Sequence, residues 1–269
     1  MRTRRAAMFA WLTLLVVLAP GASRGETDAQ PAATAPVARW LEVDHLMIHV
    51  GLGAPERAAL EAAGFRIAPG VNQHGGQGSA SITVEFADSF LELTWRDPNV
   101  PVSPGLEPVA ARFQKQGEWR TSGWSPLGIG LRRRGAAPDS FPVPTKRVRS
   151  EWMEAGDYID ILAPGDTLGP RLWVVSPSMG ADGRAASARE RERLATPENF
   201  SHPNGARRIT GVRVFLPARS LTPAARMVAG HSPVEFRAAA EWRIEVTLDG
   251  GTRHLTRDLR PRLPIVFRL

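Results

Sequence analysis

The pattern of hydrophobic and polar positions predicts a chain built from short strands and few helices. Residues 41–50 are rich in Val, Ile, Leu and Met and predict a strand. Residues 81–86 alternate polar with apolar positions, which is typical of a half-buried strand. After a turn at 87–89, residues 90–95 predict a return strand beside it.

An alanine-rich helix separates the first of these strands from the others. Pro55 stands in its first turn, where the missing N–H costs nothing, and Gly64 is suited to the position after its last turn. The run 65–67 is expected to start the next strand, and the glycine-rich stretch 72–78 to form a loop. This order predicts one βαβββ unit over about residues 40–96.

A second strand-rich region covers about residues 124–176 and follows a helix that we expect at 106–116. Its strands are expected at 127–133, 158–162 and 171–175. Residues 135–144 are rich in proline and show no helical period. We therefore expect a second module here.

A polar, charged stretch at 177–205 predicts a linker with a short surface helix. In the region that follows, Thr222 and Pro223 are typical of a helix N-cap and first helical position, and Gly230 is suited to end that helix. Strands are expected at 209–216, 241–248, 252–256 and 264–269. The order repeats that of the first module, so residues 206–269 are expected to form a third βαβββ-like module packed on the same domain.

The N-terminal residues are predicted to be a targeting segment. A positively charged start precedes an apolar run at 6–19, and small residues follow, so residues 1–25 have the order of a secretory signal peptide cleaved within 21–25. An uncleaved anchor is the alternative, although a spanning helix needs roughly 20 apolar residues. Residues 26–39 are expected to be a flexible leader, and the mature protein to be periplasmic or secreted.

Removal of the signal also changes the charge. Residues 1–25 contain four arginines and no acidic residue, so the formal net charge falls from +7 to +3. That value does not indicate a nucleic-acid-binding protein. The basic runs 132–134 and 146–149 are interpreted as solvated faces, with a surface for an anionic substrate as the alternative. The chain has no cysteine, which excludes disulfides, thiolate metal sites and cysteine nucleophiles.

His45 and Glu92 are the first candidates for chemistry, because they lie on the first and last strands of the predicted βαβββ unit. Glu92 and Thr94 share one face of their strand, and Trp95 lies on the other. A carboxylate on a concave face needs a partner, and His45 is the obvious one. The alternative for His45 is a hydrogen-bonded strand histidine that faces a polar cavity.

Other polar and aromatic residues extend the candidate site. His74 lies among glycines, where backbone can approach a ligand closely, and a turn-forming role is its alternative. His202 and Asn204 are candidate ligand contacts, and Trp95 is a candidate wall of an apolar pocket. His49 would stand roughly 13 Å from His45 on a strand, so we interpret it as a rim or structural residue.

Several short motifs, taken in order, resemble the vicinal-oxygen-chelate superfamily and, within it, the glyoxalase-like domain proteins. They are Val43-Asp44-His45-Leu46, Ala63-Gly64-Phe65, His74 before Ser79-Ala80-Ser81, Phe90-Leu91-Glu92-Leu93, and His202-Pro203-Asn204-Gly205-Ala206 with Ile209-Thr210-Gly211-Val212. The resemblance implies an α+β fold of the glyoxalase/bleomycin-resistance/dioxygenase type. In that fold, paired βαβββ modules form a cupped mixed sheet, here in a domain at 40–176 with modules of about 40–96 and 124–176.

The resemblance also implies a divalent metal in the cup. It makes His45 the first-strand ligand and Glu92 the last-strand carboxylate, with His74 or His202 completing the shell. This sequence departs from the pattern in the later regions, where Gly128 stands at a first-strand position and the last strands carry no acid. Two ligands are too few for a tight site, so a degenerate site is the alternative.

These features predict an exported protein that acts on a small organic molecule in a cupped cavity. The resemblance implies a metal-dependent lyase, isomerase or oxygenase with His45 and Glu92 as catalytic residues. The alternative is a binding protein of the same fold that sequesters its ligand without turnover, and a structural domain is a third reading if tryptophans fill the cavity. The expected partner is a small molecule and not nucleic acid, with membrane contact only through an uncleaved signal, and a homodimer is compatible with the sequence.

Overall fold

Residues 41–96 form the βαβββ unit that the sequence predicts. Its elements are β1 (Leu41–His49), α1 (Arg57–Ala62), β2 (Asn72–His74), β3 (Ser79–Glu85) and β4 (Phe90–Arg96). Strand β1 pairs in parallel with β4, and β3 lies antiparallel between β4 and β2. The computed structural model describes residues 39–135, 137–179 and 196–269, so the predicted signal peptide and its cleavage region lie outside the described residues.

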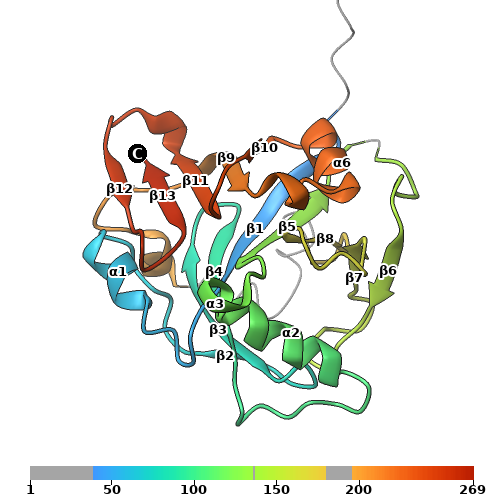
Figure 1. Ribbon diagram of the computed structural model, residues 1–269. Coiled ribbons are helices and arrows are strands. Elements are labelled where there is room, and N and C mark those ends of the chain that lie inside the picture. The colour runs from blue at the N-terminus through green and yellow to red at the C-terminus, as the bar shows by residue number, and fades with distance from the viewer. Residues whose placement is uncertain (1–38, 136, 180–195) are drawn as a thin grey trace, which may run out of the picture. The chain divides into compact units, whose positions relative to one another are not determined.

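A second module repeats this pairing. It follows α2 (Glu107–Gly117) and α3 (Trp119–Ser122) and contains β5 (Leu127–Arg133), β6 (Thr145–Val148), β7 (Ile159–Leu162) and β8 (Arg171–Val175). Strand β5 pairs in parallel with β8, and β7 lies antiparallel between β8 and β6. Antiparallel pairing of β1 with β5 joins the modules into one eight-stranded sheet, the large sheet, of order β2-β3-β4-β1-β5-β8-β7-β6 (Figure 1). This is the paired-module α+β fold expected from the sequence.

The C-terminal region forms a separate five-stranded sheet, the small sheet. Its elements are β9 (Ile209–Leu216), α6 (Pro223–His231), β10 (Val234–Ala238), β11 (Arg243–Leu248), β12 (Thr256–Asp258) and β13 (Ile265–Arg268). Strand β9 pairs in parallel with β10, whereas β13 pairs in parallel with β11. The prediction of a third βαβββ-like module is therefore wrong in its topology. The order β10-β9-β11-β13-β12 repeats the pairing directions of β4-β1-β5-β8-β7, the central strands of the large sheet.

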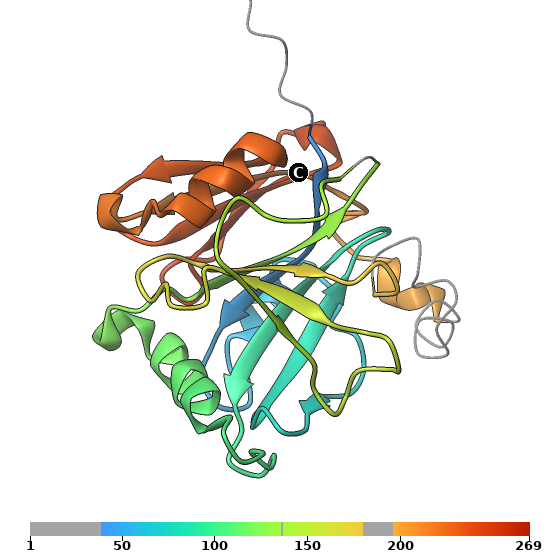
Figure 2. The same cartoon turned by 90° about the vertical axis from the view of Figure 1, so that its right-hand side faces the viewer.

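One hydrophobic core lies between the two sheets. Leu46, Ile48 and Leu93 of the large sheet belong to the same buried cluster as Val214 and Val246 of the small sheet. Figure 2 shows the C-terminal elements stacked on one side of the large sheet. The small sheet therefore covers that face, and the opposite face of the large sheet is left uncovered by it.

Several boundaries differ from the predictions because tertiary contacts fix them. Residues 65–67 do not form a strand, since the Phe65 ring packs against Phe86 and Phe267, and the second strand is β2, in the stretch expected to be a loop. The short strands β6 and β10 lie at sheet edges and were not predicted. Residues 252–255 are not the start of a strand, because β12 begins at Thr256. No helix in the described part of the chain is long and apolar enough to cross a membrane.

Candidate functional site

The uncovered face of the large sheet borders a cavity of about 490 Å³. Two rows of positions cross β4, β1, β5 and β8 on this face. The first row is Phe90, His45, Gly130 and Trp173, and the second row is Glu92, Met47, Gly128 and Arg171. Because alternate residues of a strand face the same side, positions two apart on each of the four strands build this wall.

A β-bulge in β1 turns His45 toward the cavity. Val43 and Leu46 both belong to the shared core, although residues three apart in a regular strand face opposite sides. The register with β5 shifts between Val43 and His45, so Asp44 is the extra residue at which the alternation changes phase. Asp44 and His45 therefore both line the cavity. The phase change is visible in the sequence and would have identified Asp44 as a site residue, which the sequence interpretation missed.

Asp44 fixes the orientation and tautomer of His45. An ionised carboxylate only accepts hydrogen bonds, so His45 Nδ1–H donates to Asp44 Oδ1 at 2.7 Å. The Asp44 carboxylate also lies 3.8 Å from the Arg132 guanidinium. The imidazole stacks on the Phe90 ring with centroids 4.3 Å apart. His45 Nε2 is left with its lone pair, on the side of the ring that faces Glu92.

Glu92 lies between two imidazoles. Its Oε2 is 3.9 Å from His45 Nε2, and its Oε1 is 3.8 Å from His74 Nε2. Both distances are longer than a hydrogen bond, and all three side chains line the cavity. His74 Nδ1 lies 3.3 Å from Ser79 Oγ, which orients the second ring. The structure thus brings together His45, Glu92 and His74, which we call the polar triad.

Two glycines of β5 make room for aromatic rings. A Cβ atom at Gly130 would lie 2.5 Å from Cε1 of His45, and one at Gly128 would lie 2.8 Å from Cζ3 of Trp173. Such distances are too short for real side chains, so only glycine fits at these two positions. The second module therefore places no ligating side chain opposite His45.

The second module lines the cavity with apolar side chains. Phe113 of α2, Trp173 of β8 and Ile159 of β7 belong to a buried cluster separate from the core between the sheets. They face the cavity together with Met47, which β1 contributes. The cavity thus has a polar half around His45 and Glu92 and an apolar half around these four side chains. Glu154 and Asp157 of the second module also line it.

Arg171 is the only Lys or Arg among the described residues that line the cavity. Burial and the nearby Arg112 cation lower the pKa of its guanidinium to about 10, partly offset by Glu92. It therefore stays cationic at neutral pH. The guanidinium lies 5.4 Å from the Phe113 ring centroid, and it forms no hydrogen bond or ion pair with another described residue. The sequence interpretation missed Arg171, although a basic residue at the start of an apolar strand was a signal.

His49 is fully buried, so of its two interpretations the rim residue is wrong and the structural residue stands. Neither ring nitrogen has a hydrogen-bond partner in the described part of the chain. Burial, and then the Arg171 and Arg112 cations, hold the pKa of His49 well below its usual range. The ring is therefore neutral and packs 5.3 Å from the Phe113 ring.

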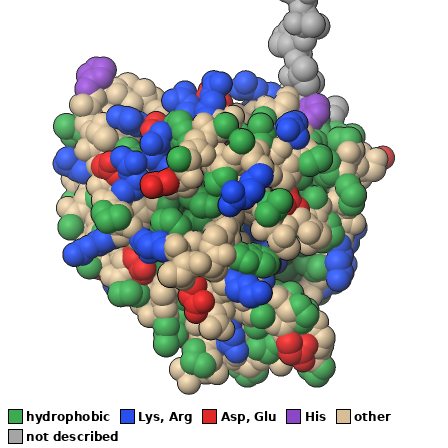
Figure 3. Space-filling view, in the orientation of Figure 1, with side chains coloured by type: hydrophobic (Ala, Val, Ile, Leu, Met, Phe, Trp, Pro, Cys, Tyr) green, Lys and Arg blue, Asp and Glu red, His purple; other side chains and the backbone are tan. Residues whose placement is uncertain are grey.

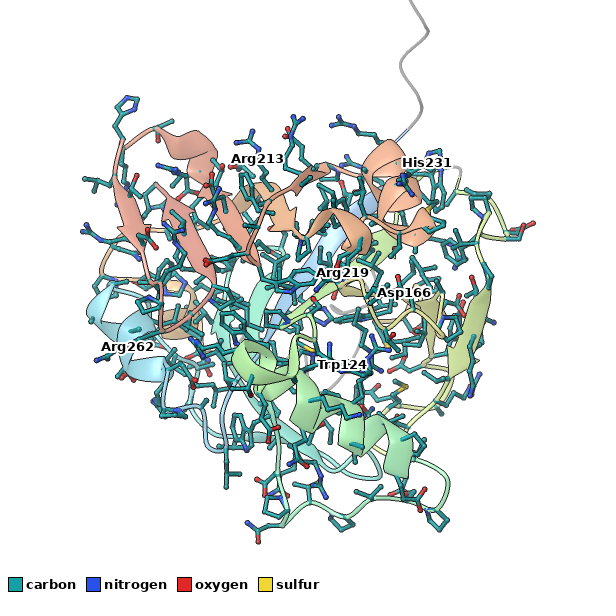
Figure 4. The ribbon with its side chains drawn as sticks, in the orientation of Figure 1. Trp124, Asp166, Arg213, Arg219, His231 and Arg262 are labelled. Atoms are coloured by element: carbon teal, nitrogen blue, oxygen red, sulfur yellow. The ribbon has the colours of Figure 1, made fainter. Side chains whose placement is uncertain are left out.

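Arg112 is held in place by contacts outside the cavity. Its Nη2 donates to the Asp166 carbonyl at 3.2 Å, and its guanidinium lies 5.7 Å from the Trp124 ring centroid. Figure 4 labels both of these neighbours. The Arg112 charge is thus fixed near Arg171 and opposes it.

Three residues predicted to contact a ligand lie outside the cavity. Trp95 has the opposite parity to Glu92 along β4, so its ring lies in the core between the sheets. His202 and Asn204 do not line the cavity either. The basic runs 132–134 and 146–149 are also absent from its wall.

Hydrogen bonds explain the positions of His202 and Asn204. His202 Nδ1 accepts from the backbone N–H of Arg66 at 3.0 Å, and its Nε2 donates to the Glu85 carbonyl at 2.9 Å. The Asn204 amide donates to the Ala63 carbonyl at 3.1 Å. These bonds fasten the described end of the predicted linker to the first module, so both side chains have structural roles.

The donors in the cavity do not match the metal site that the resemblance implies. In residues 39–135, 137–179 and 196–269, no group of three or more His, Asp or Glu side chains is arranged to hold a metal. At the strand positions opposite His45 and Glu92, the second module has Gly130, Gly128, Trp173 and Arg171 in place of ligands. A guanidinium has no lone pair to donate, and its charge opposes a second cation.

Comparison with known proteins agrees with the topology. No family model and no curated protein sequence matches the chain. A hypothetical protein from Staphylococcus aureus aligns with a TM-score of 0.52 at 11% identity, over 84% of this chain and 98% of that chain. The fold is glyoxalase-like. The paired modules and the parallel first and last strands of each carry this assignment.

Two enzyme structures align less well. A methylmalonyl-CoA epimerase in complex with methylmalonyl-CoA and ammonium aligns with a TM-score of 0.31 at 19% identity, over 54% of this chain and 99% of that chain. A mutant of 4-hydroxymandelate synthase from Streptomyces coelicolor aligns with a TM-score of 0.31 at 15% identity, over 85% of this chain and 62% of that chain. At these scores neither structure supports a reaction for this protein.

Proposed function

We propose that this protein is an exported member of the vicinal-oxygen-chelate superfamily that catalyses proton transfer on a small organic molecule, as an isomerase or a lyase. The observation that carries the proposal is the Asp44–His45 pair facing Glu92 in a cavity. The fold by itself would not fix a reaction, because one fold supports many chemistries.

Asp44 prepares His45 to act as a base. With Nδ1–H bound to the carboxylate, Nε2 can take a proton from a carbon next to a carbonyl, and Asp44 stabilises the imidazolium that forms. Glu92 Oε2 lies 3.9 Å from the same Nε2, so after a small movement it can accept the proton from His45 and return it. In an isomerisation the proton goes back to the same molecule, and in an elimination it goes to the leaving group, so neither reaction consumes another reactant.

The metal that the resemblance implies has no role in these steps. Among the described residues the donors do not complete a site for it, so no step is assigned to it. The proposal therefore depends only on side chains of this chain.

A second candidate is a binding protein that sequesters its ligand. Gly128, Gly130 and Arg171 favour it, because these second-module strand positions opposite His45 and Glu92 then carry no proton acceptor. The two candidates share the cavity and differ only in turnover.

Hydrogen exchange separates them. The mature protein is incubated with small carbonyl compounds in D₂O, and deuterium incorporation next to the carbonyl is followed by NMR. We expect His45→Gln and Glu92→Gln each to slow exchange by about 100-fold or more, whereas His254→Gln, an exposed position, leaves it unchanged. Ligand-induced thermal stabilisation without exchange would support sequestration. Stoichiometric metal in the wild type that both variants lose would restore the metal-dependent reading.

Export is tested separately. We expect the N-terminus of the protein recovered outside the cytoplasm to begin after a cleavage within 21–25. An intact N-terminus in a membrane fraction would favour the anchor. Gel filtration of the mature protein tests the homodimer.

A further inference from the structure

We infer that the cavity binds its ligand through a carboxylate, which Arg171 holds in the apolar half of the cup. This inference deepens the proposed function by naming the ligand class. It rests on that proposal for the cavity and does not depend on the reaction. Its starting point is a charged side chain that the proton-transfer chemistry leaves unused.

Arg171 is a cation without a counter-ion in the described structure. The Arg112 cation repels it, and the Glu92 carboxylate attracts it without forming an ion pair. Its immediate surroundings are apolar, with Phe113 at 5.4 Å from the guanidinium. Holding an unpaired charge in such a place is costly, so a purely structural role does not account for it.

The guanidinium can be reached from the cavity. Arg171 is partly exposed, it lines the cavity, and none of its nitrogens belongs to the buried polar atoms that lack partners. A carboxylate matches it because a guanidinium donates two parallel hydrogen bonds to a planar anion. Binding would also give the guanidinium a counter-ion, since none of the described residues forms an ion pair with it.

The register of the sheet sets the size of the ligand. Arg171 and Glu92 stand at opposite ends of the second row, with Met47 and Gly128 between them. Three strand spacings separate their Cα atoms by roughly 14 Å in a flat sheet, and the two long side chains shorten that span. Gly128 adds no side chain to the floor, and Trp173 flanks it. The geometry fits a small organic acid whose reacting carbon reaches the polar triad while its carboxylate stays on Arg171.

Equilibrium binding tests the inference without turnover. The probes are benzoate and 3-phenylpropionate, their neutral amides, and benzylamine, titrated into the mature protein by calorimetry. We expect each acid to bind at least about 10-fold more tightly than its amide, and Arg171→Gln to remove that preference. Arg257→Gln, an exposed arginine of the small sheet, is the matched control and should keep it. No carboxylate binding, equal binding of acid and amide, a preference for the amine, or a preference that survives in Arg171→Gln would each overturn the inference.

A stability measurement gives a second readout. Removing an unpaired charge from apolar surroundings should leave the thermal midpoint of ligand-free Arg171→Met unchanged or raise it by roughly 2–4 °C, whereas loss of a structural arginine would lower it. Benzoate should raise the midpoint of the wild type and not of this variant. A lowered midpoint in ligand-free Arg171→Met would contradict a ligand-binding role.

The two proposals fail in different ways. Carboxylate binding that depends on Arg171, without any hydrogen exchange, would refute the proposed reaction and leave this inference standing. Hydrogen exchange that depends on His45 and Glu92, with no preference for carboxylates, would support the proposed reaction and refute the carboxylate site at Arg171.

Discussion

At the scale of single residues, His45 shows how little the position of a functional group depends on its own chemistry. One extra residue at the bulge turns it to the cavity, the Asp44 carboxylate sets its tautomer, and the absence of a side chain at Gly130 gives its ring space. The bulge and the Asp44 hydrogen bond involve neighbours in the sequence, but only the pairing of β1 with β5 brings Gly130 next to the His45 ring.

Gly130→Ala tests that contact. The added Cβ would lie 2.5 Å from the His45 ring, so the ring must turn away from Glu92. We expect hydrogen exchange to slow by about 10-fold or more and the free energy of unfolding to fall by about 1–3 kcal/mol, as for an overpacked core site. In Gly165→Ala the new methyl group meets nothing within 4 Å, and both quantities should stay at wild-type values. Equal behaviour of the two variants would show that the His45 ring adapts.

His49 predicts an acid sensitivity of the fold. Its pKa is lowered in the folded protein, so the unfolded chain binds more protons once the pH falls below about 6.5. The neutral His49 therefore leaves the free energy of unfolding unchanged above that pH. Below it, the free energy of unfolding falls by up to about 1.4 kcal/mol per pH unit. His49→Leu should flatten the dependence between about pH 7 and pH 5 in urea unfolding, because leucine takes up no proton on unfolding. An unchanged slope would show that other groups set it.

At the scale of elements, the sequence pattern was most reliable for strands in the interior of a sheet. Strands β5, β8 and β9 begin and end where the apolar patterns predicted. The edge strands β6 and β10 were missed because an edge strand forms by pairing with a neighbour and needs no strong pattern of its own. Gly230 was expected to end α6, but the helix continues to His231.

The predicted N-cap of α6 is confirmed and can be tested. Thr222 Oγ1 accepts from the Ala225 N–H at 3.4 Å, with Pro223 at the first helical position. Thr222→Ala should lower the free energy of unfolding by about 0.5–1 kcal/mol, at the weak end for caps because the bond is long. Thr222→Ser keeps the hydroxyl and should retain most of the stability in the same denaturation experiment. A loss of equal size in both variants would assign the effect to the Thr222 methyl group.

At the scale of the whole molecule, the small sheet resembles a shortened copy of the large one, but none of its described residues lines the cavity that contains the polar triad. Its face turned away from the shared core bears ion pairs in which Arg213 contacts Glu235 and Glu245. Arg243 and Arg268 also contact Glu245. Figure 3 shows charged side chains gathered over this region, and Figure 4 labels Arg213 there. The small sheet thus supplies one side of the shared core, whereas the cavity with the polar triad lies against the large sheet.

The shared core predicts a single unfolding transition for the two sheets. Ile48 of β1 and Val214 of β9 lie in one buried cluster, so neither sheet keeps its apolar face covered without the other. Calorimetry should show one transition with equal calorimetric and van't Hoff enthalpies. Ile48→Ala and Val214→Ala should each lower its midpoint without splitting it. Two separate transitions, or a variant that shifts only one of them, would show that the sheets fold independently.

The sequence by itself determined the first module, the paired-module fold and the nearness of His45 to Glu92. Strand alternation and helix signals depend on neighbouring residues alone. They are enough to show which residues of β4 share a face with Glu92. Tertiary structure decided the rest. It placed Trp95 in the core and used His202 and Asn204 to fasten the chain. It also brought Arg171 into the cup opposite Glu92, because strand pairing joins residues far apart in the chain whose register no local pattern encodes.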